Sequence, residues 1–271
     1  MKFNIKIFKN YLPPIFLFVL RTLTKNKILF KGKFLTWEEA QKKCSGYDSK
    51  NILKKVLNAT IMVKNGEAAF ERDSIIFGEI EYVWPVIAGL MFVAAKNKGI
   101  LNVLDFGGAL GSSYFQNHNF FKKLPDVKWN VVEQPHYVDA GKKYIQDDRL
   151  QFYKSIKDCL KENQPNVILL SSVLPYLPDV NILINEIKKI GSDLIIIDRT
   201  IVNDSDTDEI YIQHVPSSIY DASYPCRSLS EKLLITKFSD RYKLTSSFPS
   251  LLFPGLDSIH SHFKGFIFTK N

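Results

Sequence analysis

Residues 101–112 read LNVLDFGGALGS, and this stretch decides the fold. A short apolar run ends in the carboxylate of Asp105, a glycine-rich turn follows, and the residues after Gly111 begin a helix. Glycine lets the backbone turn sharply and approach a ligand without a Cβ in the way. A buried strand, a glycine loop and a helix start in this order predict the edge of an α/β sheet at which nucleotide-like ligands bind.

A second strand ends in an acid at the distance that a nucleoside site requires. Residues 129–133 read WNVVE, so Glu133 follows the loop by about 20 residues, the spacing at which an acid reaches ribose hydroxyls. By itself the glycine loop also fits a tight strand-to-helix turn that binds nothing. Together with Glu133 it favours a bound nucleoside.

The glycine spacing separates two nucleoside cofactors. A dinucleotide loop reads G-x-G-x-x-G, which from Gly107 would require glycine at Ala109 and Ser112. The observed pattern, D-x-G-x-A-x-G, instead resembles motif I of the class I S-adenosylmethionine (SAM) methyltransferases, D/E-x-G-x-G-x-G, with Ala109 in place of the middle glycine. An NAD(P)-dependent oxidoreductase stays an alternative, although Ala109 and Ser112 do not match the glycines that its loop would need.

Composition limits the classes of function. The chain has 271 residues, 45% of them hydrophobic, which is enough for one well-buried core. Eight of its 36 basic residues and none of its 28 acidic residues precede Glu38, so the rest of the chain is neutral and no nucleic-acid-binding face is expected on the folded body. The scattered thiols form no Cys-x-x-Cys pair, which indicates reduced cysteines in a cytoplasmic protein. They are Cys44, Cys159 and Cys226.

The basic N-terminal segment, residues 1–36, has two interpretations. Its apolar run at 11–20 contains two prolines and has about half the length that spans a bilayer. In one interpretation residues 1–33 lie on an anionic membrane surface, which would place the protein peripherally on the inner face of the cytoplasmic membrane. In the other they form a helix that packs on the domain.

The remainder predicts a helical cap at 37–99 and an α/β domain at 100–271. Within the cap, Thr36 and Glu39 have capping-box spacing, and a long helix is expected from Asp73 to Lys98, bent at Pro85. Strands and helices then alternate, which implies a parallel sheet with helical crossovers. The strands are expected at 101–105, 128–133, 150–153, 166–171 and 193–198, with helices between them at 112–123, 136–146, 155–162 and 179–190.

The last third of the chain departs from this alternation. Residues 199–227 are aromatic and irregular, as expected for a functional loop or a short hairpin. A helix is expected at 228–238, and strands at 242–246 and 263–269 have no long helix between them, which indicates an antiparallel pair. We therefore expect a Rossmann-like, mostly parallel, seven-stranded sheet with an antiparallel last strand and an N-terminal helical extension.

Several segments together resemble a family of SAM-dependent methyltransferases encoded in bacterial surface-polysaccharide and lipopolysaccharide gene clusters. They cover most of the chain from about residue 32 onward. The matching segments are WEEA (37–40), GYDS (46–49), ERDS (71–74), 103–115, VVEQ (131–134), LSSVL (170–174), DRT (198–200) and 215–225.

The resemblance assigns the cofactor-binding residues. It implies that the loop holds the methionine end of SAM, that Glu133 accepts hydrogen bonds from both ribose hydroxyls, and that the segment after the fourth strand lies under the cofactor. The implied set is Asp105, Gly107, Gly108, Gly111, Glu133, Gln134, Ser171 and Ser172. Many methyltransferases carry a histidine where this chain has Pro175 and Tyr176.

Methyl transfer to a hydroxyl requires alignment of the nucleophile and a base for its proton. The candidate catalytic residues are His214, Asp198, Arg199 and Asp221, with His136 as a further histidine. Asp198 and Arg199 either bind an acidic sugar or phosphate or pair with each other. No metal is expected, because residues 203–209 lack the glycine and distant glutamate of an EF-hand loop, and HSH at 260–262 has no supporting cluster.

These observations predict a SAM-dependent methyltransferase that O-methylates a sugar of a cell-surface polysaccharide or lipopolysaccharide intermediate. Its expected partners are SAM, a glycan or glycolipid acceptor and, through residues 1–33, an anionic membrane. The alternative from another class is a non-catalytic protein of the SAM-binding fold that serves as a partner in glycan assembly.

Overall fold

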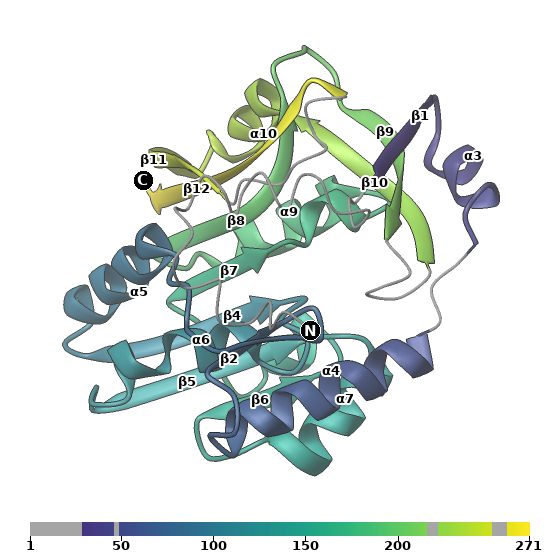
Figure 1. Cartoon of the computed structure of the whole chain (residues 1–271). Helices are drawn as coiled ribbons and strands as arrows, with labels where there is room; N and C mark the ends of the chain where they lie inside the picture. The colour runs from purple at the N-terminus through teal and green to yellow at the C-terminus, as the bar shows by residue number, and fades with distance from the viewer. Residues whose placement is uncertain (1–28, 46–48, 216–221, 251–258) are drawn as a thin grey trace, which may run out of the picture.

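The computed structural model describes residues 29–45, 49–215, 222–250 and 259–271 (Figure 1). Ten of the described strands form one sheet, and β2 and β3 form a separate hairpin. The centre of the sheet has the order β6-β5-β4-β7-β8-β12-β11, in which the first five strands are parallel and β12 runs antiparallel to both of its neighbours. The predicted seven-stranded sheet with a reversed last strand is thereby confirmed. Its strands are β4 (Ile100–Phe106), β5 (Asp126–Val132), β6 (Leu150–Tyr153), β7 (Val167–Ser171), β8 (Leu194–Asn203), β11 (Tyr242–Pro249) and β12 (Ser261–Lys270).

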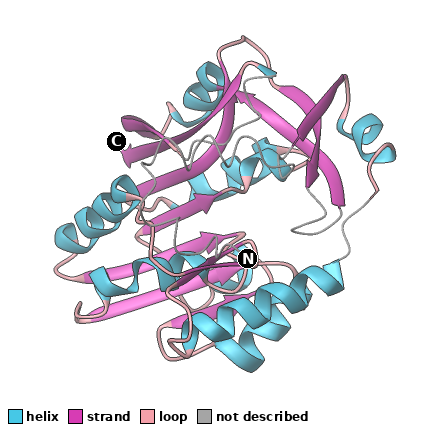
Figure 2. Cartoon of the chain, in the orientation of Figure 1, coloured by secondary structure: helices cyan, strands magenta, loops and turns pink. Residues whose placement is uncertain are grey.

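Helices cover both faces of this sheet (Figure 2). Side chains alternate between the faces along each strand, so Leu101 and Val103 pack into one core and Leu104 into the other. The first core lies under α4 (Ser49–Lys64), α5 (Trp84–Lys96), α6 (Ser112–Phe121) and α7 (Pro135–Ala140) with its π-helical continuation Gly141–Ile145. The second lies under α8 (Ile156–Cys159), α9 (Val180–Ile190) and α10 (Glu231–Phe238).

The single long helix expected from Asp73 to Lys98 is wrong. Residues 70–77 form a hairpin of β2 (Phe70–Arg72) and β3 (Ile75–Phe77), and α5 begins only at Trp84. The turn of the hairpin uses Asp73 and Ser74 at positive φ, a conformation that a right-handed helix excludes. Pro85 stands at the start of α5, where its missing N–H costs nothing.

The aromatic segment after the fifth parallel strand contains a hairpin, one of the two expected forms. It consists of β9 (Glu209–Val215) and β10 (Ala222–Ser230), which pair antiparallel. Strand β8 continues five residues beyond its predicted end, to Asn203, and its extension carries β10 and so joins the hairpin to the main sheet. The predicted helix at 228–238 accordingly begins three residues later, with Ser230 as its N-cap.

The N-terminal extension is not only helical. Strand β1 (Leu29–Phe34) pairs with β9 at the edge of the sheet, and α3 (Trp37–Lys42) follows with Thr36 as its N-cap, as the capping-box spacing predicts. Figure 1 shows β1, β9, β10 and α3 together at the upper right, apart from β4, β5 and β6. The predicted domain boundaries stay predictions, although α5 before residue 100 shares the first core with β8.

Three further expectations concern cysteines and membranes. The three cysteines are free thiols, and Cys159 and Cys226 are buried. No helix in the described part of the chain is both long and apolar enough to span a bilayer. Most of the basic N-terminal segment, residues 1–28, and the candidate Asp221 lie outside the described residues.

Candidate functional site

The glycine loop lies against the end of β5. Gly107 N–H donates to the carbonyl oxygen of Val132 at 2.9 Å, so the loop is adjacent to Glu133, the next residue. Gly107 has φ +71°, and a Cβ on it would lie 2.6 Å from Val173 Cγ2. Gly111 is the N-cap of α6. The structure therefore brings together the two sequence signals that predicted a nucleoside site.

Asp105 lies under this loop. Its side chain is fully buried, and a Cβ on Gly108 would lie 2.5 Å from its Cγ, so only glycine fits above it. Oδ2 accepts a hydrogen bond of 2.9 Å from Trp129 Nε1, whereas Oδ1 has no partner among the described residues. Burial raises the pKa of Asp105 to about 6, against the opposing hydrogen bond from Trp129. A buried acceptor without a donor suits a ligand that brings one.

Glu133 is half-buried at the end of β5. Burial raises the pKa of its carboxyl to about 7, the backbone N–H of Gln134 lowers it, and the like charge of Asp105 raises it again. No basic side chain among the described residues forms a salt bridge with it. Gln134 is exposed at the N-cap of α7. Such a carboxylate is suited to accept hydrogen bonds from a pair of ligand hydroxyls.

The middle of β8, opposite the end of β7, carries a different arrangement. Asp198 is buried, and its two carboxylate oxygens accept hydrogen bonds of 3.1 Å from Ser171 and from Ser250. Arg199 Nε lies 3.5 Å from Asp198 Oδ2, and Arg199 Nη2 donates to Ser171 Oγ at 2.9 Å. Ser172 N–H donates to the carbonyl oxygen of Asp198. Of the two interpretations of Asp198 and Arg199, the structure shows the ion pair.

The β2–β3 hairpin contributes two charged side chains that are not among the predicted site residues. Glu71 is buried and accepts a hydrogen bond from the hydroxyl of Ser112, the first residue of α6. Burial raises its pKa to about 7, against that hydrogen bond. Arg72 follows, with its guanidinium 5.2 Å from the centre of the Phe70 ring. The sequence signal for both was the charged triplet ERD at 71–73, directly before an apolar run.

Backbone strain gathers at the same edge of the sheet. Five of the seven non-glycine residues with positive φ in the described part of the chain lie in the β2–β3 turn, the glycine loop, the position after β7 and the middle of β8. Such conformations persist where the surrounding structure holds them, and they concentrate at functional sites. The five residues are Asp73, Ser74, Ala109, Ser172 and Arg199.

His214 lies on the outer side of the β9–β10 hairpin. Its neighbours at two-residue spacing, Ile210 and Ile212, pack against α3, and burial lowers the pKa of His214, followed by the charge of Lys31. The imidazole faces a surface hollow of about 460 Å³ that Lys42 and Lys43 also line. This hollow and a second one of about 540 Å³ near the starts of β5 and β6 both lie away from the glycine loop.

The inner side of the same hairpin carries a polar aromatic cluster. Tyr176, in the segment after β7, donates its hydroxyl to Gln213 Oε1 at 3.1 Å, and Gln213 Nε2 donates to the hydroxyl of Tyr224 at 3.1 Å. Gln213 is buried, and the two tyrosine rings are 5.5 Å apart. Sequence reasoning missed Gln213 and Tyr224 because the face of a strand is visible only once the strand is recognised.

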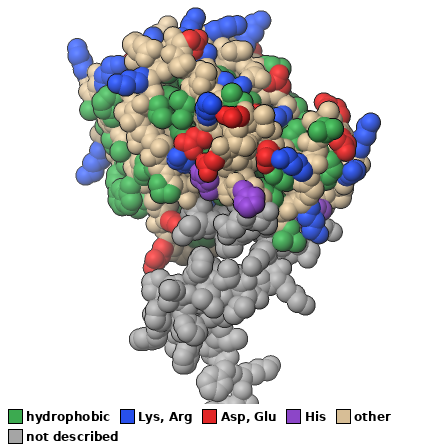
Figure 3. Space-filling view, turned by 90° about the horizontal axis from the view of Figure 1, so that it is seen from above, with side chains coloured by type: hydrophobic (Ala, Val, Ile, Leu, Met, Phe, Trp, Pro, Cys, Tyr) green, Lys and Arg blue, Asp and Glu red, His purple; other side chains and the backbone are tan. Residues whose placement is uncertain are grey.

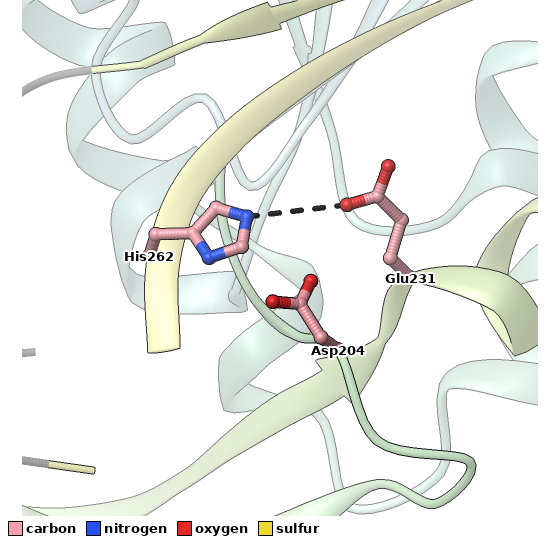
Figure 4. Close-up of side chains that lie close together, drawn as sticks. All are labelled: Asp204, Glu231 and His262. Atoms are coloured by element: carbon pink, nitrogen blue, oxygen red, sulfur yellow. Dashed lines mark ion pairs between the residues drawn. The ribbon is translucent and has the colours of Figure 1, made fainter. Parts of the chain in front are cut away.

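Two stretches that were weighed as metal sites separately lie together. Asp204, Glu231 and His262 place one ligand atom each within 4.8 Å of one another (Figure 4). Figure 3 shows a face of the molecule on which histidine side chains lie close to acidic ones. Glu231 already pairs with Lys264 Nζ at 2.5 Å, and His262 Nε2 lies 3.9 Å from its other oxygen. Lys264 therefore supplies a positive charge at Glu231.

Comparisons with known proteins identify structures of similar fold. No protein-family model matches the chain, and no curated protein matches it in sequence. Among solved structures, the chain is similar to the Burkholderia thailandensis 1,6-didemethyltoxoflavin-N1-methyltransferase with bound S-adenosylhomocysteine, at 14% identity over 92% of this chain and 96% of that one, with a TM-score of 0.41.

Two further similar structures also carry the cofactor or its product. The N-terminal domain of EvdMO1 in the presence of S-adenosylhomocysteine and D-fucose has 12% identity over 83% of this chain and 97% of that one, with a TM-score of 0.47. SAM-bound CalS10, an amino pentose methyltransferase from Micromonospora echinaspora, has 10% identity over 70% and 92%, with a TM-score of 0.43.

Proposed function

We propose that this chain is a SAM-dependent methyltransferase that binds its cofactor between the glycine loop and Glu133. One observation carries the proposal: the hydrogen bond from Gly107 to Val132 joins the loop to the half-buried carboxylate of Glu133, which has no salt bridge to a basic side chain in the described part of the chain. The site also fits the ligand, because Asp105 Oδ1 has no hydrogen-bond partner among the described residues and Gly108 leaves no space for a side chain above it.

The chain's own residues have separate tasks in this proposal. The glycine loop and Asp105 receive the methionine end, and Glu133 accepts hydrogen bonds from the ribose hydroxyls, with Gln134 beside it. When bound, SAM supplies a methyl group that is already activated on a sulfonium. The protein then has to align the acceptor hydroxyl, exclude water and take up a proton.

The acceptor side is assigned to Asp198 and Arg199 in the middle of β8 and to the hairpin beyond them. Ser171 and Ser172, which the resemblance places with the cofactor, are hydrogen-bonded to Asp198 and Arg199 and so connect the two sides. His214 and Asp221 stay the candidate bases from sequence, and the Tyr176–Gln213–Tyr224 cluster is a further set of hydroxyl and amide groups suited to a sugar.

We further propose that the acceptor is a sugar of a cell-surface polysaccharide or lipopolysaccharide intermediate, and that residues 1–33 hold the protein on the inner face of the cytoplasmic membrane. The sequence segments that resemble the polysaccharide-cluster family support the first part. The eight basic residues before Glu38 support the second. Sedimentation of the full chain with phosphatidylglycerol vesicles but not with phosphatidylcholine vesicles is expected, and equal binding to both would remove the electrostatic contribution.

Calorimetry on the full chain tests the cofactor. S-adenosylhomocysteine should bind and NADH should not, and Glu133→Gln should weaken S-adenosylhomocysteine about tenfold, because an amide accepts a weaker hydrogen bond than a carboxylate. Asp139→Asn, an exposed carboxylate on α7, is the control and should leave binding unchanged. Binding of NADH in place of S-adenosylhomocysteine would favour the oxidoreductase.

A second measurement separates an enzyme from a non-catalytic partner. Methyl-labelled SAM is incubated with the full chain and a crude glycolipid fraction, and labelled glycan is expected. Cofactor binding without any transfer would favour the glycan-assembly partner, because the missing histidine at Pro175 and Tyr176 is then a lost base.

A further inference from the structure

The β2–β3 hairpin is attached to the cofactor loop. Glu71 accepts its hydrogen bond from Ser112, the residue that directly follows Gly111, and Phe70 and Glu71 are both buried. The side chains of a strand alternate, so Arg72 points to the face of the hairpin that also carries Phe70, and its guanidinium lies over that ring. Arg72 therefore follows directly on a residue that contacts the start of α6, and its side chain lies on the opposite face of β2 from that of Glu71.

The guanidinium of Arg72 has an unused hydrogen-bonding edge. Its Nε and Nη2 are both buried and have no hydrogen-bond partner among the described residues. These two N–H groups form the fork that receives the two oxygens of a carboxylate in parallel. Leaving both donors unpartnered away from water costs free energy, which a ligand with two acceptor oxygens would recover.

The surroundings of Arg72 carry charges of both signs. Burial lowers its pKa to about 10, and the charge of Arg199 acts in the same direction. The carboxylates of Asp73, Glu81 and Asp198 act in the opposite direction, but none of them forms a salt bridge with Arg72 in the described part of the chain. The guanidinium of Arg199 forms an ion pair with Asp198 and donates from Nη2 to Ser171 Oγ.

We propose that the Nε–Nη2 edge of Arg72, supported by the charge of Arg199, is a binding site for a carboxylate group of a ligand. This inference rests on the proposed function, and it adds to that function a residue that binds a negatively charged group of the ligand. Two ligands offer this chemistry at that place: the methionine carboxylate of SAM, and an acidic group on the acceptor. Attachment of the hairpin to Ser112 favours the methionine carboxylate.

The test compares two nucleosides that differ in this group. S-adenosylhomocysteine carries the amino-acid end, and 5′-methylthioadenosine lacks it. Binding of both is measured by calorimetry on the full chain with Arg72→Met, with Arg72→Lys, which keeps the charge but not the fork, and with Arg149→Met as control. Arg149 makes an exposed hydrogen bond to the carbonyl oxygen of Lys122, away from the loop.

For the methionine carboxylate, Arg72→Met should weaken S-adenosylhomocysteine about 10- to 100-fold and leave 5′-methylthioadenosine unchanged. Arg72→Lys should weaken the binding of S-adenosylhomocysteine by a smaller factor, and Arg149→Met should leave it unchanged. If both nucleosides bind the Arg72 variants as they bind the wild type while the rate of labelling of the glycolipid fraction falls at low fraction concentration, the carboxylate belongs to the acceptor.

Two results would overturn the inference. Equal weakening of both nucleosides by Arg72→Met would mean that the guanidinium supports the fold of the site without reading a carboxylate. Unchanged binding together with unchanged transfer would mean that it has no role in recognition. Failure of the proposed function looks different, since the wild type itself would then bind neither nucleoside.

Discussion

Strands β4 and β8 each bury an aspartate, near the end of β4 and in the middle of β8, and the two differ in their hydrogen-bond partners. Asp198 in β8 has a donor on each carboxylate oxygen, from Ser171 and Ser250, with Arg199 alongside. Asp105 in β4 has one donor, Trp129 Nε1, and its Oδ1 has no partner among the described residues. A buried carboxylate that the protein satisfies by itself supports structure, whereas one that it leaves short of donors beside a glycine loop is available to a ligand.

The largest expected effect comes from removing Asp198, the aspartate whose carboxylate oxygens both have donors. Asp198→Ala would leave Arg199 buried without its carboxylate and would remove the acceptor of two serines, so the free energy of unfolding should fall by about 3 kcal/mol. Urea denaturation measures it. Asp206→Ala removes an exposed ion pair with Lys232 and should leave the free energy of unfolding nearly unchanged. If Asp198→Ala and Asp206→Ala lowered the free energy of unfolding by similar amounts, Asp198 would not have the structural role proposed for it.

The buried carboxylates near the ends of β4 and β5 should make the folded state less stable as the pH rises, whereas carboxylates in ordinary ion pairs make it less stable as the pH falls. Burial raises the pKa of Glu133 to about 7, so the folded chain binds this proton more tightly than the unfolded chain. The protonated carboxyl of Glu133 therefore contributes on the order of 3 kcal/mol to the free energy of unfolding. This contribution is complete below pH about 4.5 and is lost as the pH rises through 7. Urea denaturation between pH 5 and pH 8 should show this fall, and Glu133→Gln should flatten it. A wild-type curve that rises throughout this range would exclude it.

The close approach of loop and carboxylate can be disturbed by one methyl group. In Gly108→Ala the added Cβ would lie 2.5 Å from Asp105 Cγ, so the loop must move, at a cost of about 2 kcal/mol in stability and a loss of cofactor binding. Thermal denaturation with and without S-adenosylhomocysteine measures both effects. Gly78→Ala is the matched control, because nothing lies within 4 Å of its Cβ position. Binding retained in Gly108→Ala would show that the loop adapts.

The smallest expected effect concerns the departure from the glycine motif. Ala109 has φ +50°, where an L-residue is strained, so Ala109→Gly should raise the free energy of unfolding by about 0.5 kcal/mol. Ala88→Gly, at an exposed position inside α5, should lower it by about 1 kcal/mol. Destabilisation of both variants to the same extent would show that Ala109 carries no strain.

The sequence by itself determined the parallel sheet, the glycine loop and the pairing of that loop with Glu133. These features depend on local patterns: apolar runs that end in an acid, glycines at a turn, and a spacing of about 20 residues. Even the reversed last strand followed from the absence of a long helix before it.

Only the tertiary structure decided which charged groups meet and which face each side chain takes. Glu71 lies 41 positions before Ser112 in the chain, and Ser250 lies 52 positions after Asp198. The hairpin at 70–77 replaced a predicted helix because two residues at positive φ make a turn that apolar periodicity does not reveal. His214 and Gln213 are neighbours in sequence but point to opposite sides of a strand, and that alternation becomes visible only when β9 pairs with β1 and β10.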